Sequence, residues 1–329
     1  MNKAVVTGFL CFLLLVSFTD YVFAEPNKWK IGHVRPSGSA IDQDIHRFVK
    51  QIKAETNGNI LFDVYPASKL GDYSLVQERV SFGEVEMFVG PFGTAIDKKL
   101  ALAFTPFLVS DWDEARKVYS NESILFEKMD NFLSGQNIKL IGGWPVYFGG
   151  IALTKEPVDP GNPDISKGMI IRVPPIRCFE LTAGELGYTP YPITWMYAKL
   201  GLKTGMVEGI IGGGAEGYLG LKEIIKYYLP VKDHFEYWFV YMNLDLWKGL
   251  SEQNKKIIVN ASKEMEIRRY ATAAAEESAS IEKLKEQGVR VIEFSETERS
   301  AMRAKIRKDV WPVMRKEIGP AFDEVTANH

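Results

Sequence analysis

Segments typical of β-strands alternate with segments typical of α-helices along most of this chain, and this alternation restricts the fold more than any other feature. Residues 28–34 and 60–65 are both predicted to be short strands. A helix is predicted between them after the capping residue Ser39, with apolar residues at helical spacing: Ile41, Ile45, Phe48, Val49 and Ile52. A strand, a helix and a strand in this order predict an α/β fold.

The rest of the chain continues this rhythm. Further helices are predicted at 75–82, 110–132, 178–186, 197–203 and 218–227, and further strands at 85–89, 138–144, 169–173, 235–242 and 289–294. Ser251 is predicted to cap a long helix that runs to about residue 287, and Ser295 and Glu298 form a capping box before a last helix to about residue 318. The Pro- and Gly-rich segment 155–168 is typical of a surface loop near a domain boundary.

The N-terminus has the features of an export signal. Lys3 precedes an apolar run at residues 4–18, and Val22-Phe23-Ala24 resembles the site at which a signal peptidase cuts, so residues 1–24 are predicted to be removed. An N-terminal membrane anchor is the alternative, but the run is shorter than the roughly 20 residues that a spanning helix needs. Cleavage would remove Cys11 and leave Cys178 as the single cysteine of an exported protein.

Composition and charge exclude several classes of protein. The 40 Lys and Arg residues nearly balance the 42 Asp and Glu residues, which gives a net charge of −2 and no basic surface for nucleic acid. A 46% hydrophobic and 25% charged chain is ordinary for a globular protein, and its length suggests roughly two domains at ~150 residues each. The four histidines, His33, His46, His234 and His329, lack the spacing of metal ligands, so no metal and no cofactor are expected.

Two features could indicate an enzyme. The segment 212–217 fits the glycine pattern of a dinucleotide site, but its strand is short and no run of β-α-β units follows, which favours a tight strand-to-helix turn. Cys178 would be a nucleophile only beside a base that the sequence does not reveal, and a buried inert thiol is the better interpretation. The chain is therefore predicted not to be an enzyme, with an exported enzyme that uses Cys178 or acidic side chains as the open alternative.

Arg172 is the strongest single candidate for a binding residue. It lies in the predicted strand 169–173, which Pro174 and Pro175 terminate, so its guanidinium is expected at the carboxyl end of a strand. Ligands of open α/β sheets bind off those ends, and arginine offers a rigid fork for a carboxylate. A surface salt bridge is the alternative role.

Several segments, in order, resemble the solute receptors of tripartite ATP-independent periplasmic (TRAP) transporters, the family of C4-dicarboxylate and sialic-acid receptors. The resemblance is carried by residues 56–60, 65–66, 69–72, 82–87, 105–107, 168–174 and 202–209. Their spacing holds over nearly the whole chain after residue 24, and the predicted export signal agrees with it.

This resemblance implies a binding-protein fold of two α/β domains joined by a hinge and spanned by a long helix. Domain I is expected to comprise residues 25–149 and about 236–277, and domain II residues 150–235 and about 278–329. The implied protein is a periplasmic monomer that binds a small organic acid by hinge closure and delivers it to TRAP membrane permease subunits.

The resemblance also implies the residues that bind the ligand. The family arginine that grips the solute carboxylate matches Arg172, a pocket proline matches Pro174, and an aromatic residue matches Trp195. A frequent asparagine falls at Gly212. The full set of predicted ligand-binding residues is Arg172, Pro174, Trp195, Gly212, Phe92, Tyr73, Tyr237 and Gly90.

Departures from the family pattern indicate the ligand class. A frequent second arginine falls near Gly150, where this chain has none, and this argues against a dicarboxylate because a second buried charge would lack a partner. Gly212 is expected to give room for a wide, flat group on which Trp195 and other aromatic residues stack. An aromatic or bulky apolar monocarboxylate is therefore favoured; a small aliphatic acid, a sugar acid, or a ligand sensor for a signalling receptor are the alternatives.

Overall fold

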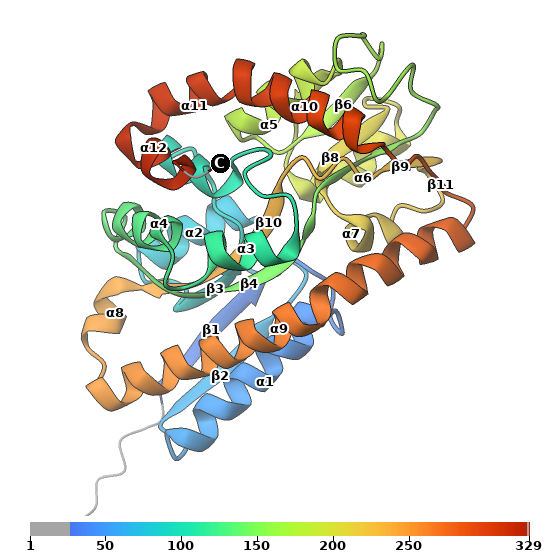
Figure 1. Ribbon diagram of the computed structural model, residues 1–329. Coiled ribbons are helices and arrows are strands. Elements are labelled where there is room, and N and C mark those ends of the chain that lie inside the picture. The colour runs from blue at the N-terminus through green and yellow to red at the C-terminus, as the bar shows by residue number, and fades with distance from the viewer. Residues whose placement is uncertain (1–26, 328) are drawn as a thin grey trace, which may run out of the picture.

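A computed structural model describes residues 27–327 and 329, and it contains two β-sheets. The predicted signal peptide lies outside the described residues. We call the parts built on the two sheets the first lobe and the second lobe. Figure 1 shows that the long helix α9 (Glu252–Glu286) runs beside both of them.

The sheet of the first lobe has the strand order β2-β1-β3-β10-β4. Its strand β1 (Asn27–His33) is parallel to β2 (Ile60–Tyr65) and to β3 (Met87–Gly90). The late strand β10 (Phe235–Asn243) inserts antiparallel between β3 and β4 (Ile138–Phe148). The first lobe therefore contains segments from distant parts of the chain.

Both faces of this sheet are covered, because successive side chains of a strand point to opposite faces. Trp238 of β10 belongs to the hydrophobic cluster that α1 (Ala40–Glu55) and α9 complete. Its neighbour Tyr237 belongs to the larger cluster on the other face, to which α2 (Tyr73–Ser81) and the 3-10 helix η1 (Lys98–Phe104) contribute. All nine residues of β10 are consequently buried.

The sheet of the second lobe has the order β11-β9-β5-β8-β6-β7. β6 is parallel to β7 and β8, and β5 is antiparallel to β8 and β9. The strands are β5 (Gly150–Leu153), β6 (Ile170–Val173), β7 (Thr189–Pro192), β8 (Gly209–Gly213), β9 (Tyr227–Leu229) and β11 (Arg290–Val291). The helices between them are α5 (Arg177–Glu185), α6 (Trp195–Lys203) and α7 (Ala215–Leu219).

The chain passes between the lobes at Gly149, which separates β4 from β5, and again at residues 230–234, which connect β9 to β10. The helix α9 contacts β4 and α1 in the first lobe, and α7 and β11 in the second. At the first crossing, Oε1 of Glu277 on α9 accepts a hydrogen bond of 2.7 Å from the backbone N–H of Phe148. Two α/β lobes spanned by a long helix confirm the fold class that the sequence predicted.

The single helix predicted for residues 110–132 is wrong. The structure has two helices there, α3 (Trp112–Tyr119) and α4 (Ile124–Ser134). The break follows Tyr119, and the Ser123 side chain accepts a hydrogen bond from the backbone N–H of Phe126, which caps the second helix.

Two other predicted elements are shorter than expected. The helix predicted for 218–227 ends at Leu219, and Tyr227 instead begins β9, while the strand predicted for 289–294 contains only Arg290 and Val291. The caps of the long helices are confirmed, since the Ser251 hydroxyl accepts from Asn254 N–H and the capping box of Ser295 is formed.

The single last helix predicted to run to about residue 318 is wrong, since the segment is divided into α10 (Glu296–Asp309), α11 (Trp311–Ile318) and α12 (Pro320–Thr326). A proline is the second residue of α11 and the first of α12, positions that favour the start of a helix. Helix α11 contacts η1, and α12 contacts α4, so both lie beside the first lobe although the sequence assigned them to domain II. The Trp311 indole N–H donates to the carbonyl oxygen of Pro106 at 2.9 Å. The domain boundaries themselves remain a prediction.

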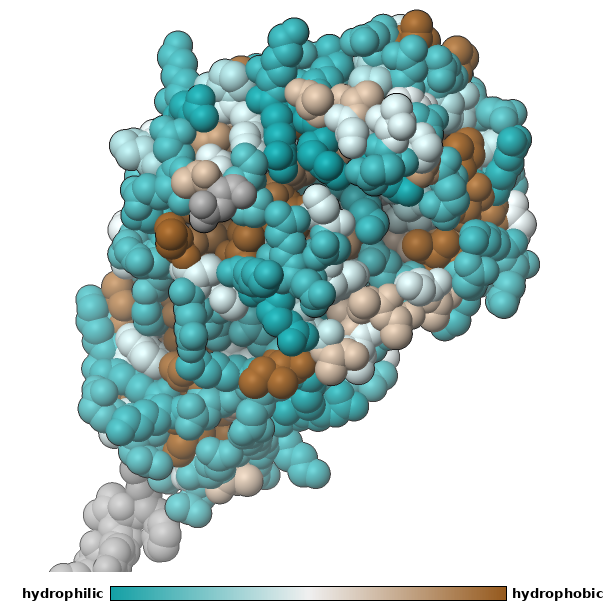
Figure 2. Space-filling view, in the orientation of Figure 1, coloured by the Kyte–Doolittle hydropathy of each residue, from teal (hydrophilic) through white to brown (hydrophobic). Residues whose placement is uncertain are grey.

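In Figure 2 most of the visible face is hydrophilic, and its hydrophobic residues form small separate areas. Among the described residues, no helix has both the length and the apolar character that crossing a membrane requires. The short helix α8 (Leu244–Lys248) closes the end of the first lobe between β10 and α9.

Candidate functional site

A cavity lies between the two lobes, with an empty volume of about 580 Å³ that includes space open to solvent. Both lobes contribute to its wall, and most of the contributing residues lie at or just after the ends of strands. The first lobe provides Val34, Arg35, Ser68, Asp72, Tyr73, Pro91, Phe104, Tyr147, Glu236 and Trp238. The second lobe provides Arg172, Pro174, Ile176, Phe179, Trp195, Met196 and Gly212.

Arg172 forms the polar part of the second-lobe wall and is only 1% exposed. Its Nε donates to the carbonyl oxygen of Ile193 at 2.7 Å, and its Nη1 donates to the carbonyl oxygen of Ile211 at 3.1 Å. No carboxylate of the described residues lies within ion-pair distance of it. Burial lowers the pKa of Arg172 from its ordinary high value. The guanidinium is therefore fixed in orientation, and no carboxylate in the described part of the chain forms an ion pair with it.

The other second-lobe residues pack closely around this arginine. Trp195 begins α6, and its ring centroid lies 5.6 Å from Cζ of Arg172, a cation–π contact. Gly212 has a φ of +82°, and a Cβ on it would lie 2.5 Å from Cγ of Pro174 and 3.5 Å from Nη1 of Arg172. The space at Gly212 is thus taken by Pro174 and Arg172, and the expectation that it makes room for a wide ligand is wrong.

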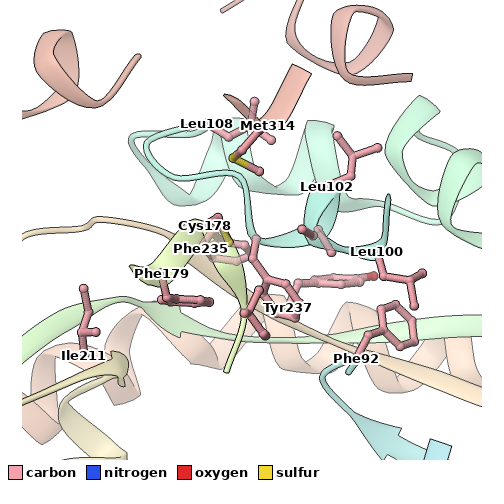
Figure 3. Packing of buried hydrophobic residues seen from close by; sticks show 14 of the residues in the cluster. Phe92, Leu100, Leu102, Leu108, Cys178, Phe179, Ile211, Phe235, Tyr237 and Met314 are labelled. Carbon is pink, nitrogen blue, oxygen red and sulfur yellow. The ribbon is translucent and has the colours of Figure 1, made fainter. Parts of the chain in front are cut away.

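The structure brings five of the eight predicted ligand-binding residues to the cavity and leaves three outside its lining. Those that line it are Arg172, Pro174, Trp195, Gly212 and Tyr73. Phe92 and Tyr237 lie in the hydrophobic core of the first lobe (Figure 3), where Phe92 stacks on Phe239 at 4.5 Å between centroids. Gly90 is equally enclosed, since a Cβ there would lie 2.3 Å from the Phe88 ring.

Tyr237 is held in that core by a polar partner. Its hydroxyl donates to Oε1 of Glu266 on α9 at 2.6 Å. Burial raises the pKa of Glu266 to about 7, although the Tyr237 hydrogen bond acts in the opposite direction. This pair joins the sheet of the first lobe to the long helix and takes no part in the cavity wall.

Sequence reasoning missed several polar and aromatic cavity residues, of which Arg35 is the most important. Arg35 follows β1, so the rule that pointed to Arg172, a charged residue at the carboxyl end of a parallel strand, would have pointed to it as well. A second arginine was considered in the sequence only near Gly150, whereas the structure supplies one from the first lobe. Tyr147, Glu236 and Trp238 lie on β4 and β10 and carried no comparable signal.

Two carboxylates face the same cavity. Oδ1 of Asp72 caps α2 by accepting a hydrogen bond from the backbone N–H of Ser74. Burial raises the pKa of Asp72, although this hydrogen bond and the charge of Arg172 each act to lower it. Oε1 of Glu236 accepts from the indole N–H of Trp238 at 2.6 Å. The wall therefore combines two guanidinium groups with two carboxyl groups.

Behind Glu236, His234 forms a buried charge cluster. Its Nδ1 lies 2.6 Å from Oδ2 of Asp233, and its Nε2 lies 3.4 Å from Oε2 of Glu236. Burial alone would lower the pKa of His234, but the charges and hydrogen bonds of these two neighbours raise it to about 10. The imidazole is thus cationic at neutral pH and compensates part of the negative charge beside the cavity.

The thiol of Cys178, the candidate nucleophile of the sequence analysis, is not activated. Cys178 is buried in α5, and burial raises the pKa of its thiol well above the ordinary value, which keeps it protonated. Within the described residues, no group of three or more His, Cys, Asp or Glu side chains is arranged to hold a metal ion.

A cavity between two α/β lobes, with an unpaired buried arginine on its wall, defines a solute-binding protein of the two-lobed class. The family model DctP, described as bacterial extracellular solute-binding protein, family 7, matches residues 31–317. The chain therefore belongs to this family, whose members are receptors that act outside the cytoplasm with TRAP membrane components and are not enzymes.

Relatives and solved structures agree with this assignment. The sialic acid-binding periplasmic protein SiaP of Vibrio cholerae is 22% identical over 271 residues, which cover 80% of this chain and 81% of that protein. A TRAP periplasmic solute-binding protein from Desulfovibrio salexigens, solved with bound orotic acid, has a TM-score of 0.83 at 22% identity over 91% of this chain and 96% of its own. One from Chromohalobacter salexigens, with bound D-glucuronate, has a TM-score of 0.82 at 20% identity, covering 91% and 98%.

Proposed function

We propose that this protein is a periplasmic receptor that captures one small organic acid and delivers it to a TRAP-type membrane permease. Arg172 carries the proposal. Its guanidinium is buried, is oriented by two backbone carbonyl groups, and lacks a carboxylate partner among the described residues, which suits it to a ligand carboxylate. Closure of the two lobes around the bound acid would be a hinge motion.

The cavity wall also bears on the class of acid. Trp195, Trp238, Tyr147 and Tyr73 offer flat surfaces, which supports a ligand with a ring or another flat body. This agrees in part with the aromatic or bulky apolar monocarboxylate that the sequence favoured. However, a purely apolar body would leave the polar groups of Asp72 and other wall residues without partners, and this is costly in a closed site.

We therefore favour a ring-shaped monocarboxylate that carries polar substituents. Both an aromatic heterocyclic acid and a sugar acid fit this description, and related proteins of this fold were solved with orotic acid and with D-glucuronate. A small aliphatic acid remains the alternative.

A thermal-shift screen of the purified protein tests the proposal. The panel consists of orotate, D-glucuronate, indole-3-acetate, phenylpyruvate and succinate. A ligand at about 100 times its dissociation constant stabilises the folded state by about 2.7 kcal/mol, which is easily measured. We expect orotate or D-glucuronate to give the largest shift. If no acid shifts the transition, the receptor function is contradicted, and if succinate gives the largest shift, the ring-shaped class is contradicted.

The remaining sequence-based assignments are part of the same proposal. Residues 1–24 would be removed on export, so the mature protein would begin at Glu25. The hinge would lie at the two chain crossings, Gly149 and residues 230–234, with domain boundaries as predicted from the sequence. Mass spectrometry of the protein recovered from the periplasm tests the cleavage site, because retention of residues 1–24 would give a heavier chain.

A further inference from the structure

Arg35 is a second guanidinium in the cavity wall, and it comes from the first lobe. It is 7% exposed and lies just after β1. It borders the cavity on one side and, on the other, an outer groove between the lobes that Lys199, Glu216 and Gly217 help to line. Arg35 therefore lies between the cavity and this groove.

The Arg35 side chain has no polar partner among residues 27–327 and 329. Its Nε is buried without a hydrogen bond, and no ion pair or side-chain hydrogen bond within this part of the chain involves its guanidinium. Two indole rings hold it instead, with Cζ 5.2 Å from the ring centroid of Trp195 and 5.4 Å from that of Trp238. Of the five N–H donors of this guanidinium, the buried one at Nε lacks an acceptor, which is costly, so an acceptor from outside the chain is expected.

The two arginines are close enough to contact one ligand. Trp195 makes cation–π contacts with both of them, so their Cζ atoms are no farther apart than the two contact distances combined. The absence of a side chain on Gly217 allows α7 to approach Arg35, since a Cβ there would lie 3.0 Å from Nη2. A ring-shaped ligand bound at Trp195 would thus lie within reach of an arginine from each lobe.

The charges of the wall determine which acceptor fits Arg35. Arg35 and Arg172 are already matched in number by Asp72 and Glu236, which line the same cavity. The carboxylate of the ligand adds one negative charge beside Arg172. The carboxyl groups then outnumber the two guanidinium groups by one, and a second ligand carboxylate would raise this excess to two, which is unfavourable because each buried anion in excess lacks a pairing cation. A neutral oxygen accepts hydrogen bonds from Arg35 without this cost.

We propose, on the basis of the proposed function, that Arg35 is a second ligand-anchoring residue that binds a neutral carbonyl or hydroxyl oxygen of the acid. Arg172 binds the carboxylate, and Arg35 selects acids that carry this second oxygen on the ring. Because the two arginines belong to different lobes, such an acid also connects the lobes and favours the closed arrangement.

Calorimetry with two matched series of acids tests this role. The aromatic series is benzoate, orotate and terephthalate, and the saturated series is cyclohexanecarboxylate, D-glucuronate and cyclohexane-1,4-dicarboxylate. Each series contains a bare ring, a ring with carbonyl or hydroxyl groups, and a ring with a second carboxylate. We expect orotate or D-glucuronate to bind at least about tenfold more tightly than the other two acids of its series. One additional charge-assisted hydrogen bond accounts for a difference of this size.

The variants Arg35→Met and Arg35→Lys then test whether Arg35 causes this difference in affinity between the acids. We expect Arg35→Met to weaken binding of orotate or D-glucuronate at least about tenfold and to weaken binding of the bare-ring acid clearly less. Arg35→Lys keeps the charge but loses the fork, so it should recover only part of the affinity. Arg47→Met, at an exposed arginine of α1, is the matched control, and thermal unfolding without ligand shows whether each variant is folded.

The outcomes separate this inference from the proposed function. If acids bind but Arg35→Met weakens all members of a series equally, or none of them, Arg35 is not a selective anchor. If terephthalate or the cyclohexane dicarboxylate binds most tightly, Arg35 takes a second carboxylate and the assigned class is wrong. If no acid in either series binds the wild-type protein, the proposed function fails together with this inference.

Discussion

The two lobes each contribute an arginine to the cavity, but they hold it in different ways. In the second lobe, Arg172 donates to two backbone carbonyl groups, so its orientation is determined before any ligand arrives. In the first lobe, Arg35 rests between Trp195 and Trp238 and has no polar partner in the described part of the chain. In the proposed complex, a ligand therefore meets one anchor oriented by backbone carbonyl groups and one held only by aromatic rings.

The residues that pack around the two arginines also differ between the lobes. The second-lobe anchor lies among glycine and proline backbone, where Gly212 allows Pro174 and Arg172 to approach closely. The first-lobe side is built from larger side chains, including Glu236 and Trp238 of β10. The difference suggests that the second lobe recognises the common carboxylate and the first lobe distinguishes between acids.

The largest effect is expected for Arg172→Ala, which removes the rigid anchor. Hydrogen bonds to charged groups contribute about 1.5–3 kcal/mol each, so the affinity for the best acid of the screen should fall by more than tenfold, since ~1.4 kcal/mol corresponds to tenfold. Arg172→Lys should not restore it, because an ammonium cannot form the fork. Calorimetry measures both variants. A larger loss in Arg35→Met than in Arg172→Ala would reverse the roles of the two lobes.

The close packing of the second lobe predicts a loss of stability in Gly212→Ala. At a φ of +82° an alanine is strained by roughly 1–2 kcal/mol, and its Cβ would also collide with Pro174. Gly184→Ala is the matched control, because Gly184 lies in α5 and a Cβ there meets no atom within 4 Å. Chemical denaturation should show a lower free energy of unfolding for Gly212→Ala alone. Equal stability of the two variants would contradict the packing described for this lobe.

The first lobe predicts a pH-dependent stability through Glu266. Because burial raises the pKa of Glu266 from 4.5 to about 7, the folded state keeps a proton that the unfolded state has lost between these values. The free energy of unfolding should therefore decrease as the pH rises from about 4.5 to about 7, by up to about 1.4 kcal/mol for each unit of the pKa shift.

The variant Glu266→Gln should remove this dependence, since an amide accepts the Tyr237 hydrogen bond without titrating. Glu264→Gln, on an exposed position of α9, is the control. Urea denaturation at several pH values measures the slope. The same pH slope in Glu266→Gln and in the wild-type protein would show that another group is responsible.

The smallest effect is expected at Cys178, which lies in the second lobe but outside the cavity lining. Burial raises the pKa of its thiol, so alkylation of the native protein should be slow and should accelerate only on unfolding. Cys178→Ala should bind the acid with unchanged affinity by calorimetry. Rapid alkylation of the native protein, blocked by bound acid, would favour the alternative of an enzyme.

Much of the fold could be predicted from the sequence because local patterns specify it. The segment 60–65 is a strand with those bounds, and the long helix capped by Ser251 ends within one residue of its predicted end. The errors fall where local signals compete. The helix predicted for 110–132 was divided by a polar segment that includes Ser123, which caps a new helix.

The site was only partly predictable. Arg172, Pro174 and Trp195 were found because their motifs are local, and all three line the cavity. Tyr237 was selected on β10, but its neighbours Glu236 and Trp238 line the cavity instead. One position along a strand reverses the face to which a side chain points, and a strand buried on both faces shows no alternation that would reveal the difference.

The sequence by itself indicated the alternation of helices and strands, the family and the proposed carboxylate anchor Arg172, because each depends on residues close together in the chain. The tertiary structure decided which distant residues share the cavity with that anchor. Arg35, Asp72 and Glu236 meet there only because β1, α2 and β10 come together around one sheet of the first lobe. This packing sets how deeply each charged side chain of the wall is buried and which other charges lie near it. These two factors determine what the side chain can bind.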